Sequence, residues 1–486
     1  MSMRRELTLE LIGDPARPVF LDLAESLIRE IRRGRLMPGQ ILPGTRALSR
    51  TLGLHRNTVD AAYHELTMQG WLVARPSRGT FVAEDLPHIE RADTAPLHEF
   101  MPHTLPQIPP SAMLMITDGT PDPRLMPRVE LARAFRMVLT SSIFLSSSGY
   151  ADSKGACALR AALAEEFLNA RGLTVSADDI LITHGSQMGL YLAASAALTP
   201  GDGIAVEDPG YPFAWASFRA GGARVIGIPV DEDGLDVDCL AEKVKLDPGI
   251  RAVYVTPHHH YPTTVTLGAG RRLRLLELAR QHDLLIIEDD YDHDYRFDSA
   301  PVLPLAARAV AEQRLIHIGS LSKLTIPVLR LGYVIAPPDI LNRMTELRKV
   351  IDRQGDVPLE QAMALLIRNG VLGRHARKAR RIYAERRDFL LTEIVRRLGA
   401  AVTFATPAGG LAVWLIINPA IDAAAWAAAA LDNGLQIEPG NRFSLEAGSD
   451  LNCFRFGYAH LDRSEIAKAI AIMAASLPAK GSAAPP

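Results

Sequence analysis

The sequence has few of the features that would place it in a membrane or in an oxidising compartment. Its three cysteines, Cys157, Cys239 and Cys453, are odd in number, far apart and without the spacing of metal ligands, which favours a reducing compartment. The longest apolar block, residues 423–431, is far shorter than the roughly 18 residues of a membrane span. No continuous apolar stretch follows the charged start to form a secretory signal. We therefore expect a cytoplasmic protein without a membrane partner.

A strong net charge is also missing, but the charge is distributed unevenly. The whole chain carries −2, whereas residues 1–82 hold twelve arginines, no lysine and eight acidic residues, a net charge of +4. Such a basic end is typical of an attached nucleic-acid-binding module, although a chance imbalance would look the same.

Aromatic residues are nearly absent from residues 83–115, which hold six prolines and only Phe100. This composition predicts an extended tether rather than a packed domain. At 486 residues the chain exceeds the usual size of one core. We expect a DNA-binding module over 1–82, this linker, and a large domain over 116–480.

The N-terminal module has the periodicity of three helices. Apolar residues recur at helical spacing over 19–33 and 57–69, and a short helix from Thr45 to Leu52 lies between them, with Thr45 as a possible N-cap. The second and third helices are joined by a short turn, which predicts a helix-turn-helix whose last helix enters the major groove.

A basic hairpin follows the third helix. Apolar residues at 71–74 and 80–82 flank a turn with two arginines, the form of a wing that reaches phosphates or the minor groove. The alternative is a protein-interaction module whose arginines are merely solvated. The predicted DNA contacts, at the helix starts and the hairpin tip, are Arg46, Arg56, Asn57, Thr58, Arg75, Arg78 and Gly79.

From residue 117 onward, apolar strands alternate with helical patterns. This order predicts α/β architecture with a mostly parallel sheet. We also expect a smaller C-terminal α+β subdomain. In such sheets, ligands gather at the carboxyl ends of the strands. The predicted strands are 180–183, 203–207, 224–229, 251–256, 284–288 and 314–319.

The segment 318–333 carries the strongest chemical signal. Lys323, on a tight loop after a strand, suits a Schiff base with a carbonyl compound. The hydroxyls of Ser320 and Ser322 and the forked guanidinium of Arg330 suit a phosphate monoester. An aldehyde and a phosphate held by one loop describe pyridoxal 5′-phosphate, and the alternative is a surface lysine beside a serine-rich turn.

Polar and aromatic residues follow other predicted strands. Ser186 and Gln187 open a helix whose first N–H groups suit a second phosphate contact. Tyr211, fixed between a glycine and a proline, suits stacking on a planar heterocycle, or simple packing within its loop. The acidic run 288–292 offers a carboxylate for a protonated pyridine nitrogen and a phenol for a ring hydroxyl, or alternatively a magnesium site.

Two further features concern ligands. Arg455 lies between two phenylalanines, and a buried arginine requires a carboxylate either from the protein or from an amino-acid ligand. Residues 258–260 are three adjacent histidines. Because neighbours in an extended chain point to opposite faces, they rarely share one ion, and we expect no metal site.

The N-terminal motifs also carry a family resemblance. Residues 34–46, with the Pro38-Gly39 pair, residues 52–59 and residues 79–82 resemble the GntR-type winged helix-turn-helix over the whole module. His55 stands where serine is usual, next to the recognition helix. The resemblance implies a double-stranded DNA operator with paired half-sites.

Residues 117–475 resemble the fold-type I aminotransferases, and the motifs 288–292 and 319–323 match the branch fused to GntR-type readers, the MocR-type regulators. The resemblance implies that Lys323 forms the internal aldimine with pyridoxal 5′-phosphate. It further assigns roles to the residues at the strand ends. Asp289 would pair with the pyridine nitrogen, Tyr291 with the ring oxygen and Tyr211 with the ring face, while Ser320, Arg330 and the Ser186-Gln187 turn hold the phosphate and Arg455 takes an effector carboxylate.

Three positions depart from the family pattern. Thr264 replaces a common glycine and His260 a usual glutamine, both on the ring-hydroxyl side of the predicted site. Val328 replaces a usual glycine just after Pro327, where it could change the backbone near Lys323. None of the three removes a group that attaches the cofactor.

The sequence therefore predicts a PLP-dependent transcriptional regulator that senses an amine or amino-acid effector through external aldimine formation. The resemblance implies a homodimer in which each large domain helps to build its partner's site. One alternative is a working aminotransferase that its N-terminal domain only localises. Another is a degenerate domain that no longer binds the cofactor.

Overall fold

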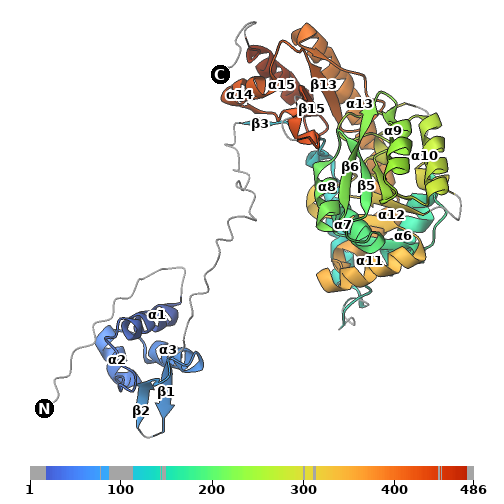
Figure 1. Cartoon of the computed structure of the whole chain (residues 1–486). Helices are drawn as coiled ribbons and strands as arrows, with labels where there is room; N and C mark the ends of the chain where they lie inside the picture. Colours follow the sequence, from blue (N-terminus) through green and yellow to red (C-terminus); the bar gives the residue numbers. More distant parts are fainter. Residues whose placement is uncertain are drawn as a thin grey trace. The chain divides into compact units, whose positions relative to one another are not determined.

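The computed structural model describes residues 18–76, 78–86, 113–142, 144, 149–298, 302–309, 314–446, 449 and 451–478. It divides the chain into two units, Met1–Ile108 and Pro109–Pro486 (Figure 1). Most of the expected linker, including all six of its prolines, lies outside the described residues. The three-part division at 82 and 115 therefore stays a prediction.

The N-terminal unit has the predicted order of a helix, a helix-turn-helix and a hairpin. Its core is formed by buried residues such as Leu23, Val59, Leu66 and Trp71, which the three helices and the hairpin share. The elements are α1 (Val19–Arg32), α2 (Thr45–Leu52), α3 (Arg56–Met68), β1 (Leu72–Arg75) and β2 (Gly79–Val82), with β1 and β2 antiparallel.

The start of α2 differs from the sequence-based expectation. Gly44, in extended conformation, is the N-cap, and Thr45 is already the first helical residue. The prediction of Thr45 as a cap was therefore wrong. Glycine is also favoured at N-caps, and the sequence pattern alone did not separate the two positions.

The Pro109–Pro486 unit is built on an eight-stranded sheet. The strand order is β4-β11-β10-β9-β8-β5-β6-β7, and the neighbours from β10 to β6 are all parallel. Strand β11 runs antiparallel to both β10 and β4, and β7 pairs antiparallel with β6. The strands are β4 (Ile180–Thr183), β5 (Gly203–Asp208), β6 (Arg224–Asp231), β7 (Gly234–Leu235), β8 (Ile250–Val255), β9 (Leu285–Asp290), β10 (Leu315–Ser320) and β11 (Gly332–Ile335).

Helices cover both faces of this sheet, because its strands are apolar on both sides. In β9, Leu285 and Ile287 belong to the core shared with helices on one face, whereas Ile286 belongs to the core on the other face. Figure 1 shows the two layers. The first face carries α7 (Gly185–Ala197), α8 (Pro212–Ala220) and α11 (Pro338–Ile351), and the second carries α9 (Val237–Leu246) and α10 (Ala269–His282).

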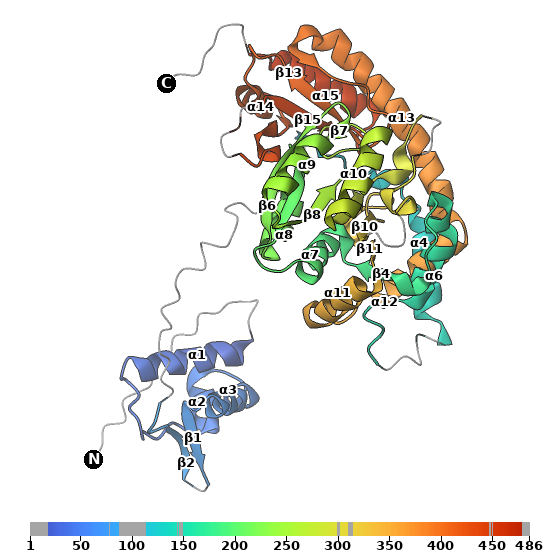
Figure 2. The ribbon, with the colours of Figure 1, turned by 45° about the vertical axis from the view of Figure 1, so that its right-hand side comes forward.

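A further core lies at the β4 and β11 end of the sheet. It is formed by α4 (Arg128–Leu139), α6 (Cys157–Ala162) and α12 (Val357–Arg368). The long helix α13 (Val371–Arg397) joins this core to the C-terminal subdomain (Figure 2). Leu372 at its start packs with α12, whereas Leu390 belongs to the C-terminal core.

The C-terminal subdomain is α+β, as predicted. Its antiparallel sheet has the order β12-β13-β15, and Trp426, Phe454 and Phe456 fill the core beneath the helices. Strand β14 pairs in parallel with β3. The elements are β3 (Leu114–Met115), β12 (Val402–Thr403), β13 (Ala412–Ile417), α14 (Ala423–Asp432), β14 (Leu435–Gln436), β15 (Cys453–Gly457) and α15 (Arg463–Ala475).

Candidate functional site

Lys323 lies in the turn that follows β10, half-buried beneath the C-terminal subdomain. Its Nζ donates a hydrogen bond to the carbonyl of Gly119 over 2.7 Å. Burial, reinforced by the positive charge of Arg455, lowers the pKa of Lys323 to about 8. The amine is therefore far more readily deprotonated than a surface lysine, which is the state needed for attack on a carbonyl.

Asp289, near the end of β9, has one carboxylate oxygen that is hydrogen-bonded and one that, within the described part of the chain, is not. Tyr254 in β8 donates its hydroxyl hydrogen to Oδ2 over 3.0 Å. The buried Oδ1 has no hydrogen-bond partner among the described residues. Burial raises the pKa of Asp289 to about 7. A protonated ring nitrogen would satisfy Oδ1 and restore the charged form, so this position fits a pyridinium partner.

Three tyrosines, Tyr211, Tyr261 and Tyr291, lie on neighbouring loops. Tyr211 meets Tyr261 edge to face, with ring centroids 4.9 Å apart, and donates a hydrogen bond to Gln187 over 3.4 Å. The Tyr291 hydroxyl donates to the carbonyl of His259 over 2.9 Å. Tyr261 also lies edge-on to Tyr291, so the three rings form one aromatic wall.

A close approach of two glycines and an arginine forms a cradle at the start of α7. The Arg330 guanidinium donates from Nη2 to the carbonyl of His184 over 3.1 Å. A Cβ on Gly185 would lie only 2.8 Å from that nitrogen, and a Cβ on Gly332 would lie 2.7 Å from the Gly185 carbonyl carbon. The first N–H groups of α7, including those of Ser186 and Gln187, have no partner within the helix and suit a phosphate.

The other predicted phosphate residues contribute differently. The Gln187 amide donates to the Phe213 carbonyl over 2.8 Å and to Ser217 Oγ over 2.6 Å, which leaves its backbone N–H for an anion. Ser322 is buried and donates to the Leu331 carbonyl over 3.3 Å, so it supports the loop. Ser320, the last residue of β10, is half-buried next to this loop.

Arg455 is buried in β15 among backbone carbonyls. It donates from Nε to the Asp118 carbonyl over 3.0 Å and from Nη1 to the Pro262 carbonyl. Its guanidinium lies 4.5 Å from the centroid of the Tyr261 ring. Within the described part of the chain it forms no ion pair, so the protein carboxylate that the sequence left open as a partner is not found there. A buried guanidinium in this state is suited to a ligand carboxylate.

The N-terminal unit places the predicted DNA contacts on one helix-turn-helix and its hairpin. Arg46, Arg56 and Asn57 are exposed and Thr58 is half-exposed. His55 is the N-cap of α3, because its Nδ1 accepts the Asn57 N–H over 3.3 Å. The histidine thus serves as the cap that serine commonly provides.

The hairpin tip also presents basic residues. Arg78 is exposed, and Gly79 has a φ of +105°, which favours glycine where Arg75 and Gly79 close the hairpin. Arg75 forms an exposed ion pair with Glu84 at 3.1 Å and lies over the Phe81 ring. Of the two hairpin arginines, Arg78 alone has no ion pair among the described residues.

Comparisons with known proteins match both parts of the chain. The family model of aminotransferase class I and II matches residues 129–473, and that of the bacterial regulatory proteins of the gntR family matches residues 21–82. The HTH-type transcriptional regulator TauR of Rhodobacter capsulatus is 31% identical, over 94% of this chain and 96% of its own length. The probable rhizopine catabolism regulatory protein MocR of Rhizobium meliloti is 29% identical, over 93% and 92%.

The chain is a MocR-type regulator of the GntR family. Solved aminotransferases match its large domain only. LysN, the alpha-aminoadipate aminotransferase of Thermus thermophilus complexed with N-(5′-phosphopyridoxyl)-L-leucine, is 28% identical with a TM-score of 0.69 and covers 75% of this chain and 92% of its own. The regulator thus joins a winged helix-turn-helix to a domain with the fold of PLP-dependent aminotransferases. No helix in its described residues is long and apolar enough to cross a bilayer.

The three departures of this MocR-type regulator from the family pattern have different structural outcomes. Thr264 has a φ of +67°, the conformation that favours glycine. His260 is buried beside Glu207, and burial followed by the charge of Arg455 lowers its pKa to about 3, so the ring is neutral. Val328 is 81% exposed and lies in the short turn before Arg330.

Sequence reasoning missed several residues of the regulator's site. Tyr254 is a buried strand residue whose sequence context resembles any core tyrosine, and only its pairing with Asp289 reveals its role. Gly119 lies far from Lys323 in sequence. Tyr261, beside the three histidines, was visible as an aromatic residue before a proline, but its contact with Arg455 depends on the folded chain.

Proposed function

We propose that this MocR-type regulator binds pyridoxal 5′-phosphate at Lys323 and changes its DNA affinity when an amino-acid or amine effector reacts there. The observation that carries the proposal is a lysine with a lowered pKa near a buried arginine that forms no ion pair among the described residues. Arg455 contributes to the lowered pKa of Lys323, so the two groups are close enough to interact. An amino acid brings both the amine and the carboxylate that such a pair receives.

Several residues around Lys323 would hold the cofactor, each through a different part of the molecule. The cofactor, when bound, supplies an aldehyde and an electron-withdrawing ring. Asp289 would keep a proton on the ring nitrogen through its unpaired Oδ1. Tyr211 would cover the ring face. The Tyr291 hydroxyl, which donates to the His259 carbonyl in this structure, would turn its hydrogen to the ring oxygen. The phosphate would be bound by Arg330, Ser320 and the backbone N–H groups of Ser186 and Gln187.

Regulation requires that the effector distinguishes two arrangements of the protein. A ligand with equal affinity for both arrangements shifts neither, however tightly it binds. Arg455 gives the effector a contact outside the cofactor ring, and the Tyr261 ring lies against that arginine. Occupation of Arg455 by a carboxylate would therefore change the packing of the aromatic wall, which is where the two arrangements would differ.

A homodimer is part of the proposal, and α4 offers the surface for it. Val129, Met137 and Leu139 on this helix are exposed although apolar. Leu139 also lines a cavity of about 670 Å³, together with Leu131, Phe135 and Ile326. Apolar surface of this kind marks an interface. Two winged modules per dimer would read paired half-sites roughly one or more helical turns apart, in the cytoplasm where the operator DNA lies.

The test combines absorbance and DNA binding in the full-length protein. The wild type should show the visible absorbance band of the bound cofactor, and Lys323→Ala should lose it. Arg455→Ala should keep the band but lose the response of operator affinity to an amino-acid effector, measured by fluorescence anisotropy. A wild type without the band would support the degenerate domain, and an unchanged effector response in Arg455→Ala would contradict the carboxylate role.

The second candidate function is transamination, favoured by the likeness of the large domain to LysN. A site with Lys323, Asp289 and Arg455 holds most of the groups that this reaction needs. Repeated turnover with an amino donor and a 2-oxo acid, together with no binding to DNA upstream of its own gene, would reverse the order of the two candidates.

A further inference from the structure

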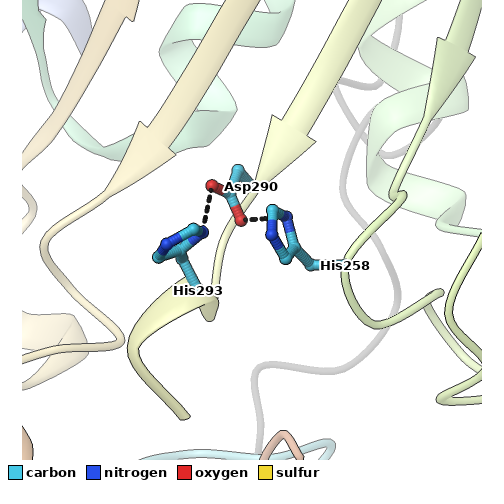
Figure 3. Close-up of side chains that lie close together, drawn as sticks. All are labelled: His258, Asp290 and His293. Atoms are coloured by element: carbon cyan, nitrogen blue, oxygen red, sulfur yellow. Dashed lines mark ion pairs between the residues drawn. The ribbon is translucent and has the colours of Figure 1, made fainter. Parts of the chain in front are cut away.

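Three side chains from separate segments converge on the face of β9 opposite to Asp289. They are His258, in the loop after β8, Asp290, the last residue of β9, and His293, at the start of the short helix His293–Tyr295. The carboxylate of Asp290 lies between the two imidazoles (Figure 3). Its oxygens are 3.1 Å from His258 Nδ1 and 3.1 Å from His293 Nδ1.

The hydrogen bond of His258 is made by Nε2, and its Nδ1 has no hydrogen-bond partner among the described residues. Its Nε2 lies 2.5 Å from the carbonyl of Val302, which can only accept, so Nε2 carries the hydrogen. Burial lowers the pKa of His258, but the Asp290 charge outweighs it, so the net shift is upward. Nδ1 therefore faces the carboxylate with a proton, or with a lone pair when a metal ion replaces that proton. Both Nδ1 atoms and both Asp290 oxygens are buried and make no hydrogen bond within the described part of the chain.

Facing acceptors in a buried site require a cation between them. One such cation is a proton on each imidazole, which makes the two 3.1 Å contacts ion pairs, and the other is a metal ion in place of those protons. A tetrahedral metal ion with bonds of about 2.0 Å has neighbouring ligand atoms about 3.3 Å apart. The distances of 3.1 Å from His258 Nδ1 to Asp290 Oδ1 and from His293 Nδ1 to Asp290 Oδ2 are close to this spacing, with each imidazole facing its own carboxylate oxygen. Ligand atoms of all three residues lie within 4.8 Å of one another.

We propose that His258, Asp290 and His293 bind a divalent transition metal ion, with zinc as the preferred ion. Two imidazole nitrogens and one carboxylate oxygen are a common ligand set for zinc, and the Val302 carbonyl orients His258 as outer partners of zinc histidines commonly do. A cavity of about 980 Å³ is lined by His258 and His293, together with charged side chains that include Arg171 and Arg296.

The run of three histidines does not itself make the site. His259 pairs with Asp292 at 2.8 Å, and the Nδ1 of His260 lies 2.7 Å from Thr263 Oγ1. Only His258 turns toward Asp290. The expectation of no metal site considered only whether the adjacent histidines 258–260 could share one ion. The second imidazole of the proposed site comes instead from His293, which follows the next strand, β9.

The experiment measures zinc binding by the full-length protein after removal of any affinity tag and treatment with a chelator. Titration calorimetry with zinc chloride should show one ion per chain. His258→Ala and His293→Ala should each weaken binding at least tenfold. His282→Ala, at the end of α10, removes a histidine elsewhere and should bind zinc like the wild type.

A second measurement covers the case in which a variant fails to fold. Cobalt added to the wild type should give the intense visible bands of a four-coordinate ion, and zinc should displace them. The band of the pyridoxal cofactor should persist in His293→Ala, because Lys323 and Asp289 lie outside the cluster. Zinc binding that is absent from the wild type, or unchanged in both histidine variants, would leave a buried ion pair and overturn the proposal.

Discussion

Thr264 holds a backbone conformation that its own branched side chain disfavours. A φ of +67° costs a non-glycine residue about 1–2 kcal/mol, whereas glycine adopts it freely but loses about 0.5–1 kcal/mol through the flexibility of the unfolded chain. Thr264→Gly should therefore raise the free energy of unfolding by about 0.5–1 kcal/mol. The hydrogen bond from its N–H to His260 would remain. Thermal melting of the purified protein measures the effect.

Thr263 supplies the matched control. Its φ is not positive, and its hydroxyl contacts His260, so Thr263→Gly should lower stability. If both glycine variants were destabilised to the same degree, strain at Thr264 would not be the cause of either effect.

Asp289 makes the cofactor-free protein sensitive to pH. Its pKa is about 7 in the folded protein against an ordinary 3.8, so between these values the folded state holds a proton that the unfolded state has released. Stability then falls as the pH rises through this window and stays low above it. Asp289→Asn should remove on the order of 1–3 kcal/mol of this loss.

The measurement compares melting temperatures of cofactor-stripped wild type and Asp289→Asn between pH 4 and 8. The difference should grow with pH in favour of the variant. Glu207 is also buried, with a pKa raised to about 8 by burial and, in part, by the charge of Asp289. The difference between the two curves therefore includes the relief of Glu207 as well as the loss of Asp289. If the two curves of melting temperature against pH were parallel, the pKa of Asp289 would not be raised in the folded protein.

At this scale the sequence offers a residue type for each role, and those roles stay predictions, whereas it does not show which residues become neighbours. Asp289, Lys323 and Arg455 follow from their motif contexts, because each chemistry needs one kind of side chain. The neutral state of His260 does not follow, since it depends on burial and on Arg455, which lies far along the chain. Single sequences carry no record of such long-range contacts.

Among the elements, β11 controls the geometry of the proposed phosphate cradle. A Cβ on Gly332 would lie 2.7 Å from the Gly185 carbonyl carbon and 2.8 Å from the Ser186 nitrogen, too close for the backbone to accept unchanged. Gly332→Ala should push the start of α7 away and weaken cofactor binding at least tenfold, measured by titration of the stripped protein. Gly270→Ala, in α10 with open space around it, should bind the cofactor normally.

The fate of the predicted strands shows which elements a sequence reveals. All six predicted strands exist within one or two residues of their expected ends, because each is a short run of mostly apolar residues. Strand β11 was not predicted. It has four residues and is separated from Arg330 only by Leu331, and its antiparallel position between β10 and β4 comes from pairing across the sheet.

For the whole molecule, DNA affinity should depend on the net charge that α3 brings to the phosphates. Arg56→Ala should weaken operator binding and reduce the slope of log affinity against log salt by about 1, because one fewer phosphate would be neutralised. Arg343→Ala, on α11 in the large unit, should leave the slope unchanged. Anisotropy titrations at several salt concentrations measure both slopes.

Strand β9 places Asp289 at the proposed cofactor site and Asp290 at the proposed metal site. Both sites therefore depend on the number of residues in this strand. Successive residues of a strand face opposite sides, so inserting or deleting one residue within β9 would exchange the two carboxylates. Point substitutions disable one site at a time, but a single-codon insertion here would disable both together. In a library of single-codon insertions along the gene, no insertion within β9 should therefore give a functional protein. Many substitutions of side chains in the same strand should still do so.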